Sequence, residues 1–389
     1  MKSSFPIKTF TLLWLSHFLV DFYIGIWPIY KTVAQIDIAK AGLIMGVAGF
    51  SGEILQVIFG YFSDRGLRKI IYLFGLLMTA AIVFTSLTSN LYLLFGIMLC
   101  IMVGSGAFHP AAVGVTSNLI PSKKISILIF STGGALGLAL SQVVFSKCWD
   151  RFDGHIWPLA LPALLLVPFL LRHPFPKQHT ERPNLKEIFL PILKQRRPLT
   201  LLYFTQVVTY GVILSFIFLL PDILQAKGAS PWLFKGGGHM CFIFGAFMGM
   251  VALGFISHRI GIKSTLLSAN LSALLLFVTF LLSPTFSTGG TIALLGAMGG
   301  SLFLMNPLVI SWGNQLVPES PSTVSALMMG LAWCLSNLFP AIAGLLVRLL
   351  PTAPEVMAMT IISLTLVVSM VLLALTPLQE KEPTLHLSE

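Results

Sequence analysis

Long apolar stretches alternate with short polar segments along nearly the whole chain. About twelve such stretches can be marked, and each has roughly the 20 residues that an α-helix needs to cross a bilayer. Apolar runs of this length predict membrane-spanning helices. The expected fold is therefore an all-α membrane protein with 12 transmembrane helices, at residues 8–30, 41–62, 70–88, 91–117, 125–147, 156–172, 199–220, 239–256, 264–282, 289–312, 322–348 and 355–376.

The chain contains the same pattern twice. Residues 104–110 (GSGAFHP) have a counterpart in 300–307 (GSLFLMNP), and GYFSDR at 60–65 has one in GFISHR at 254–259. TLLWLSH at 11–17 likewise matches TLLYFTQ at 200–206. Repeated membrane halves are the plan of many secondary transporters. We therefore expect two pseudo-symmetric six-helix bundles.

One long polar connection, rich in Lys, Arg and Pro, separates the sixth and seventh stretches. It divides the chain into an N-terminal bundle (1–172), a cytoplasmic linker (173–198), a C-terminal bundle (199–376) and a cytoplasmic tail (377–389). Within the linker, Asn184 and Glu187 have the spacing of a capping box before a short amphipathic pattern. Pro191 weakens that helix, so a surface helix and an irregular solvated loop are both open.

The distribution of basic residues along this chain predicts its orientation in the membrane. Hydrophobic residues make up 56% and charged residues only 10%, against about a quarter in soluble proteins, and the net charge is +10. The basic residues are spread by loop and form no polar face for nucleic acid, so the lipid bilayer is the expected partner. By the positive-inside rule both termini are cytoplasmic. The inner segments hold Lys2, Lys8, Arg65, Arg68, Lys69, Lys123, Lys124, seven basic residues in 172–197, Arg259, Lys263 and Lys381, and the outer ones hold Lys31, Lys40, Lys147, Arg151, Lys227, Lys235 and Arg348.

Other classes of function find no support in the residue pattern. The four cysteines lie in or beside apolar spans without paired spacing, which predicts neither disulfides nor a zinc site. No nucleophile with a base, no metal set and no phosphate-binding Gly-rich loop is evident. We therefore expect no catalytic residue, no metal and no cofactor, and a membrane-embedded enzyme or a channel is only a remote alternative.

A loop motif supplies the first family resemblance. Residues 60–69, GYFSDRGLRK, resemble the pattern Gly-x-x-x-Asp-Arg-x-Gly-Arg-Lys of the major facilitator superfamily, with the second glycine one place early. The second half keeps the pattern at 254–263, with His258 in place of the aspartate. The resemblance implies a cytoplasmic gate in which Asp64 pairs with cations; a membrane anchor without a gating part is the alternative. The gate residues would be Gly60, Asp64, Arg65, Arg68, Gly254 and Arg259.

Three further segments resemble the fosmidomycin-resistance-like branch of that superfamily: His17-x-x-x-Asp21, residues 104–110 and residues 325–333. The resemblance implies a monomeric secondary transporter in a bacterial inner membrane, moving a small organic solute by alternating access. Efflux is the default for the family, and import of a metabolite or siderophore-like carboxylate is the alternative. The fifth stretch lacks the proline of the drug-antiporter pattern at 133–137, which weakens the prediction of export.

Four ionisable residues lie inside apolar spans of the first half: His17, Asp21, Glu53 and His109. Such a residue costs about 2.5–3.5 kcal/mol at mid-membrane, so it normally faces a partner or a cavity. The i, i+4 spacing of His17 and Asp21 puts both on one helix face. We interpret the four as the proton-coupling group, with a purely structural or substrate-only cluster as the alternative.

The second half offers neutral groups at the equivalent positions. Gln206 corresponds to His17, Tyr210 to Asp21 and Asn306 to His109. This asymmetry predicts that the first half handles protons and the second half hydrogen-bonds the substrate. A central cavity near mid-membrane is where such transporters bind substrate. The predicted substrate-binding residues are Gln142, Gln206, Tyr210, Asn306, Trp312, Asn314, Trp333 and Asn337.

Overall fold

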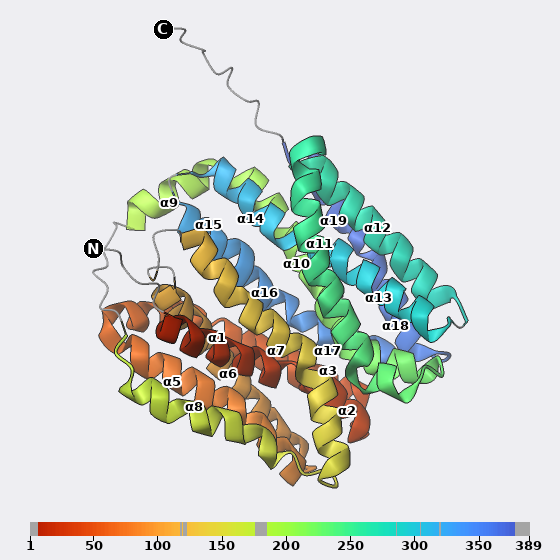
Figure 1. The fold of residues 1–389 in the computed structure, drawn as a ribbon. Helices are drawn as coiled ribbons and strands as arrows, with labels where there is room; N and C mark the ends of the chain where they lie inside the picture. The colour runs from red at the N-terminus through yellow and green to blue at the C-terminus, as the bar shows by residue number, and fades with distance from the viewer. Residues whose placement is uncertain are drawn as a thin grey trace, which may run out of the picture.

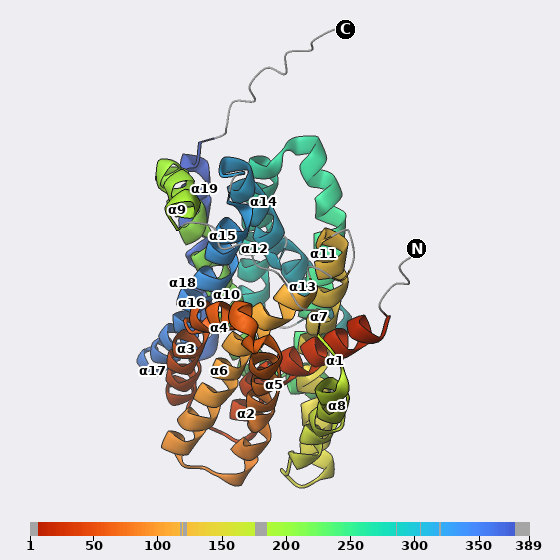
Figure 2. The ribbon, with the colours of Figure 1, turned by 90° about the vertical axis from the view of Figure 1, so that its left-hand side faces the viewer.

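The protein is an all-helical bundle in two groups of helices. The computed structural model describes residues 7–116, 119, 123–175, 185–284, 286–303, 305–318 and 320–377, and within these ranges every regular element is a helix. The predicted all-α class is confirmed. Figures 1 and 2 show the first half in red to yellow and the second in green to blue. The predicted tail beyond residue 377 lies outside the described residues.

The first half is a series of long helices, several of them broken by a bend into shorter ones. Its elements are α1 (Ile7–Ile24), α2 (Trp27–Val33), α3 (Ile38–Glu53), α4 (Gln56–Phe62), η1 (Ser63–Leu67), α5 (Arg68–Thr79), η2 (Ala80–Leu87), α6 (Leu91–Thr116), α7 (Lys123–Arg151), η3 (Trp157–Ala160) and α8 (Leu161–Arg172).

The second half follows the same plan after a short helix, α9 (Leu185–Lys194), in the linker. Its helix α10 (Arg196–Ala226) begins three residues before the predicted boundary at 199. The other elements are η4 (Leu233–Gly237), α11 (Gly238–Ile260), α12 (Ile262–Leu282), α13 (Thr288–Phe303), α14 (Met305–Leu316), α15 (Pro321–Ala326), η5 (Leu327–Leu331), α16 (Ala332–Ser336), α17 (Leu338–Leu349), α18 (Pro354–Leu364) and α19 (Leu366–Leu375).

Consecutive helices often join into stretches of membrane-spanning length. Among the described residues, nine helical stretches are long and apolar enough to cross a bilayer. One of them, Ile38–Leu87, is 50 residues long and includes the predicted span 41–62 and all but the last residue of the predicted span 70–88, and Trp157–Arg172 is a shorter apolar helix. The chain is therefore a multi-span membrane protein, and the number twelve stays a prediction.

Glycine lets helix backbones touch within each half. In α11 and α13, Gly245 and Gly249 lie against the backbone of Gly296 and Gly300, and a Cβ on Gly299 would collide with the carbonyl oxygen of Phe242. In the first half α1 and α7 pack in the same way at Gly133 and Gly137. Such close approach maximises van der Waals contact, a main source of helix association in lipid.

The two halves meet at one end of the molecule, which we call the closed end. There Gly42 of α3 lies against the carbonyl of Pro340 in α17, and Gly46 lies against Ala341. Gly236 of η4, with a φ of +116°, lies against the backbone of Gln142 and Val143 in α7. Figure 1 shows the halves drawing together where α2, α3 and α17 lie, while α9 is at the opposite end of the second half.

The close packing of α11 on α13 yields a stability prediction. Gly299→Ala should lower the free energy of unfolding by about 1–3 kcal/mol, because the added methyl collides with the Phe242 carbonyl. The matched control is Gly289→Ala, at an exposed position on the same helix with nothing within 4 Å of the added Cβ. Thermal unfolding of both purified variants measures the difference. Equal midpoints for the two variants would contradict the packing argument.

Candidate functional site

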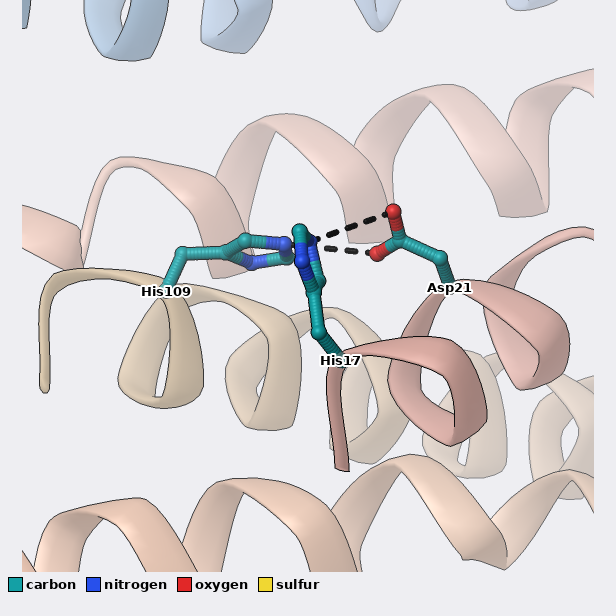
Figure 3. A group of neighbouring side chains, drawn as sticks. All are labelled: His17, Asp21 and His109. Atoms are coloured by element: carbon teal, nitrogen blue, oxygen red, sulfur yellow. Dashed lines mark ion pairs between the residues drawn. The ribbon is translucent and has the colours of Figure 1, made fainter. Parts of the chain in front are cut away.

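Three of the ionisable residues predicted in the first half converge in the structure. His17 and Asp21 come from α1 and His109 from α6, and Figure 3 shows the carboxylate facing both rings. His17 Nε2 lies 3.4 Å from Asp21 Oδ2, and His109 Nε2 lies 3.3 Å from Asp21 Oδ1. The two rings meet edge to face, with centroids 5.4 Å apart. One carboxylate thus faces two imidazoles inside an apolar bundle.

The other nitrogen of each ring is bonded to the backbone. His17 Nδ1 donates to the carbonyl of Phe130 on α7 at 3.0 Å, and the ring stacks on that phenyl ring at a centroid distance of 4.1 Å. His109 Nδ1 donates to the carbonyl of Ser105, one turn earlier on α6, also at 3.0 Å. A carbonyl only accepts, so both Nδ1 atoms carry hydrogen. The Nε2 atoms are left to face Asp21.

Glu53 joins the cluster through Ser105. The Ser105 hydroxyl lies 2.6 Å from Glu53 Oε1 and 3.3 Å from His109 Nδ1, so it bridges α3 and α6. The second carboxylate oxygen of Glu53 accepts from Gln56 Nε2, across the break between α3 and α4. All four predicted coupling residues therefore form one continuous polar cluster, although Glu53 does not contact Asp21 directly.

Small residues make room for this cluster. Gly134 on α7 faces it, because a Cβ there would collide with Asp21 Oδ2 and crowd the His17 ring. On α6, Gly106 lies against the carbonyl oxygen of Gly52 on α3. This close approach of the two helices brings His109 near Glu53. The glycines that the sequence places at these positions are thus required by close approach and not by turns.

The neutral counterparts in the second half also come together. Gln206 Nε2 on α10 donates to Asn306 Oδ1 on α14 at 2.9 Å. Tyr210, one turn after Gln206, packs edge to face on Trp333 of α16, with centroids 4.7 Å apart. The structure therefore groups four of the predicted substrate residues in two pairs.

The other predicted substrate residues lie elsewhere. Trp312 is buried in a hydrophobic cluster within the second half, and Asn314 Nδ2 donates to Ser325 at 3.2 Å. Gln142 and Asn337 are buried at the contact between the halves, against Gly236 and Gly49 respectively. Neither polar atom of the Gln142 amide has a hydrogen-bond partner among the described residues.

The predicted gate motif forms a tight bend at η1. Arg68 is buried and donates to Asp64 at 2.6 Å and to Ser63 at 3.2 Å, while Arg65 lies over the Tyr61 ring. Gly66 has a φ of +99°, which explains the glycine at this place in the loop. In the corresponding motif of the second half, the glycine with positive φ is Gly261, one position later in the repeat. Gly60 begins the motif on α4, and Gly254 and the exposed Arg259 lie on α11.

The last lysine of each motif has a role that sequence reasoning missed. Lys69 Nζ donates to the carbonyls of Leu171 and His173 at the end of α8, at 2.6 and 3.0 Å. Its counterpart Lys263 donates to Ala374 and Thr376 at the end of α19, at 2.7 and 2.8 Å. Each lysine thus satisfies terminal carbonyls of the last helix in its half. Burial, with Lys69 and Lys8 nearby, holds the pKa of His173 below its usual value.

A buried ion pair across the halves was also missed. Lys31 of α2 is fully buried and pairs with Asp222 of α10, and Thr32 donates to the other carboxylate oxygen at 3.0 Å. The Lys31 ammonium also lies 4.6 Å from the centre of the Phe218 ring. A second pair, Lys235 to Asp150 at 2.8 Å, crosses the halves at an exposed position. The sequence alone places Lys31 among the charges of the outer segments. An aspartate directly after Pro221 inside an apolar run is the signal for this pair in the sequence.

Comparisons with known proteins agree with this architecture. The sequence profile of the Major Facilitator Superfamily matches residues 9–341. The fold is similar to a bacterial homolog of the human lysosomal transporter Spinster in an inward-facing, unoccupied conformation (TM-score 0.69, 17% identity, 96% of each chain covered). It is also similar to the nucleoside transporter NupG (TM-score 0.73, 16% identity, covering 95% of this chain and 98% of that one). No curated protein matches by sequence. From the profile match over most of its length, the chain belongs to the major facilitator superfamily.

Proposed function

We propose that this protein is a proton-coupled secondary transporter that moves a small organic solute by alternating access. Membership of the superfamily supports a secondary transporter and not an enzyme. The finer parts of the proposal are proton coupling, efflux as the default direction, a monomer, and a bacterial inner membrane with both termini in the cytoplasm. Placement in the fosmidomycin-resistance-like branch is also part of it and rests on the three sequence segments that resemble that branch.

The observation that carries proton coupling is the Asp21 carboxylate facing two imidazoles within membrane-spanning helices. An ionised side chain inside the membrane is costly unless it has a partner. Gain or loss of a proton by one residue of the cluster therefore changes which partners the other residues can have. Glu53 extends the cluster through Ser105 to the neighbouring helix α3. The facing groups on α1, α3 and α6 are His17, Asp21, Glu53 and His109, and α7 contributes a backbone carbonyl.

Alternating access is supported by the contacts at the closed end. With cytoplasmic termini this end faces outward, so the conformation is closed outside. The halves touch there through small residues such as Gly42 and Gly46 and through the pair of Lys31 with Asp222. Glycine contacts interlock few side chains, and an ion pair can be re-solvated when the halves separate. We infer that this pair is an outer gate.

The substrate site is proposed between the halves, with Gln206, Asn306, Tyr210 and Trp333 contributing from the second half. Amide groups and aromatic faces suit an organic solute with hydrogen-bonding groups. The nucleosides named for NupG belong to that protein, and at 16% identity the likeness supports the fold alone. Gly60, Asp64, Arg65, Arg68, Gly254 and Arg259 are proposed to form the gate at the opposite end, where Asp64 now pairs within its own half.

The first test replaces the central carboxylate. A thermal-shift screen of purified protein identifies a ligand, and its uptake into proteoliposomes is then followed under imposed pH gradients of either sign. Asp21→Asn should abolish accumulation against the solute gradient, because it removes the charge and keeps the shape. Ligand affinity should change by less than about tenfold.

The control is Asp37→Asn, an exposed residue whose side chain caps α3, since asparagine caps a helix equally well. That variant should couple normally. Gradient-driven accumulation by Asp21→Asn would refute the assignment of Asp21. Accumulation that occurs only when the solution outside the vesicles is more acidic than the solution inside would indicate import instead of efflux.

The second test breaks the proposed outer gate. Lys31→Met leaves Asp222 without its cation, and removing one partner of a buried pair costs about 3–5 kcal/mol. Opening the outer end would re-solvate the carboxylate, so the equilibrium should move at least about tenfold toward outward-open states. Spin labels at exposed positions Lys40 and Thr352, in a background without native cysteines, should report longer distances.

Lys235→Met is the matched control for the gate. It breaks the exposed pair with Asp150, which is worth only about 0–1 kcal/mol, so its distance distribution should stay close to that of the parent protein. Equal distributions for Lys31→Met and Lys235→Met, in folded protein, would rule out a gating role for the buried pair.

A further inference from the structure

The cluster around Asp21 has the donor set of a metal site. His17, Asp21 and His109 each offer one ligand atom, and the three atoms lie within 4.8 Å of one another. The separation from His17 Nε2 to Asp21 Oδ2 is 3.4 Å, and that from His109 Nε2 to Asp21 Oδ1 is 3.3 Å. Donors about 2.0–2.1 Å from a tetrahedral zinc ion lie about 3.3–3.4 Å apart, so each imidazole lies at a suitable distance from one of the two carboxylate oxygens. Both separations also exceed the roughly 2.7–2.9 Å of charge-assisted hydrogen bonds.

The backbone bonds of the two rings orient the correct atoms toward the ion position. Because each Nδ1–H donates to a carbonyl, each imidazole in its neutral form directs the Nε2 lone pair at the carboxylate. Lone pairs and a carboxylate repel one another unless a positive species lies between them. Donation of the second ring N–H to a backbone carbonyl is also how metal-bound histidines are normally held.

Space for the ion depends on α7. Gly134 faces the cluster, and a Cβ there would collide with Asp21 Oδ2 and lie 2.5 Å from His17 Nε2. Stacking on Phe130 holds the His17 ring, and the bond from Ser105 to Glu53 holds the region around His109. The donors are therefore fixed by neighbouring helices, as a selective site requires.

We propose that His17, Asp21 and His109 form a binding site for one first-row divalent transition-metal ion, such as Zn²⁺ or Co²⁺. Two imidazole nitrogens and one carboxylate suit these ions, whereas Mg²⁺ and Ca²⁺ take oxygen donors. Three protein ligands leave a tetrahedral ion one position for water or a solute oxygen. The inference concerns the residues of the proposed coupling cluster, but metal binding itself does not require that the transporter be coupled to protons.

The experiment measures binding of the metal alone to the full chain, purified in detergent with any affinity tag removed. Equilibrium dialysis against Co²⁺ with elemental analysis gives the stoichiometry, and visible absorption of the bound Co²⁺ gives its geometry. We expect one ion per chain with the intense bands of a tetrahedral site. Zn²⁺ should also raise the unfolding temperature of the unaltered protein, whereas Mg²⁺ should not.

Three variants locate the ion. His17→Gln and His109→Gln should each weaken Co²⁺ binding by more than about tenfold, because each removes one ligand. Gly134→Ala keeps all ligands but fills the space beside them, and should do the same. The matched control is His155→Gln, the same substitution at an exposed histidine in the 152–156 connection, which should bind like the parent protein.

Absence of Co²⁺ uptake and of a Zn²⁺-dependent rise in unfolding temperature would overturn the inference without use of any variant. Uptake that survives both His17→Gln and His109→Gln would overturn it as well. Failure of the proposed function is separate: it is read from transport by Asp21→Asn in metal-free buffer. If Asp21→Asn loses coupling and the unaltered protein binds no metal, only the metal site is rejected. If the unaltered protein binds metal and Asp21→Asn still couples, only the proton assignment is rejected.

Discussion

The structure depends on one constraint: an ionisable group inside an apolar helix must find its partner within the protein. Asp21 meets this requirement with two histidines, Glu53 with Ser105 and Gln56, and Lys31 with Asp222. The first two sets of contacts lie within the first half and tie α1, α3 and α6 together. The third crosses between the halves. The same requirement therefore holds helices of the first half together and also joins the first half to the second.

The sequence predicted those features that depend on local spacing. His17 and Asp21 share a face because they are four residues apart, and the apolar stretches predicted the all-helical membrane fold that the structure confirms. His109 and Glu53 were recognised because an ionisable residue in an apolar run is unusual. Their convergence with α1 was a hypothesis, since no periodicity within one helix shows which helix lies beside it.

What the sequence could not supply were contacts between distant segments. Lys31 lies near the end of an apolar stretch, where a lysine normally reaches the interface, and only the position of α10 shows that it is buried against Asp222. Gln142 and Asn337 have the composition of substrate residues, but they lie where α7 and α3 meet the second half. Polarity alone does not distinguish a group that awaits a solute from one buried between helices.

The matching bonds of Lys69 and Lys263 show a contact that the two halves have in common. Each lysine closes the end of the last helix in its own half, so each half retains the contact that completes it as a bundle. The aspartate of the same motif is present in the first half and replaced by His258 in the second. The bond to the terminal carbonyls is thus common to both copies of the repeat, whereas the motif position five residues before each lysine differs between them.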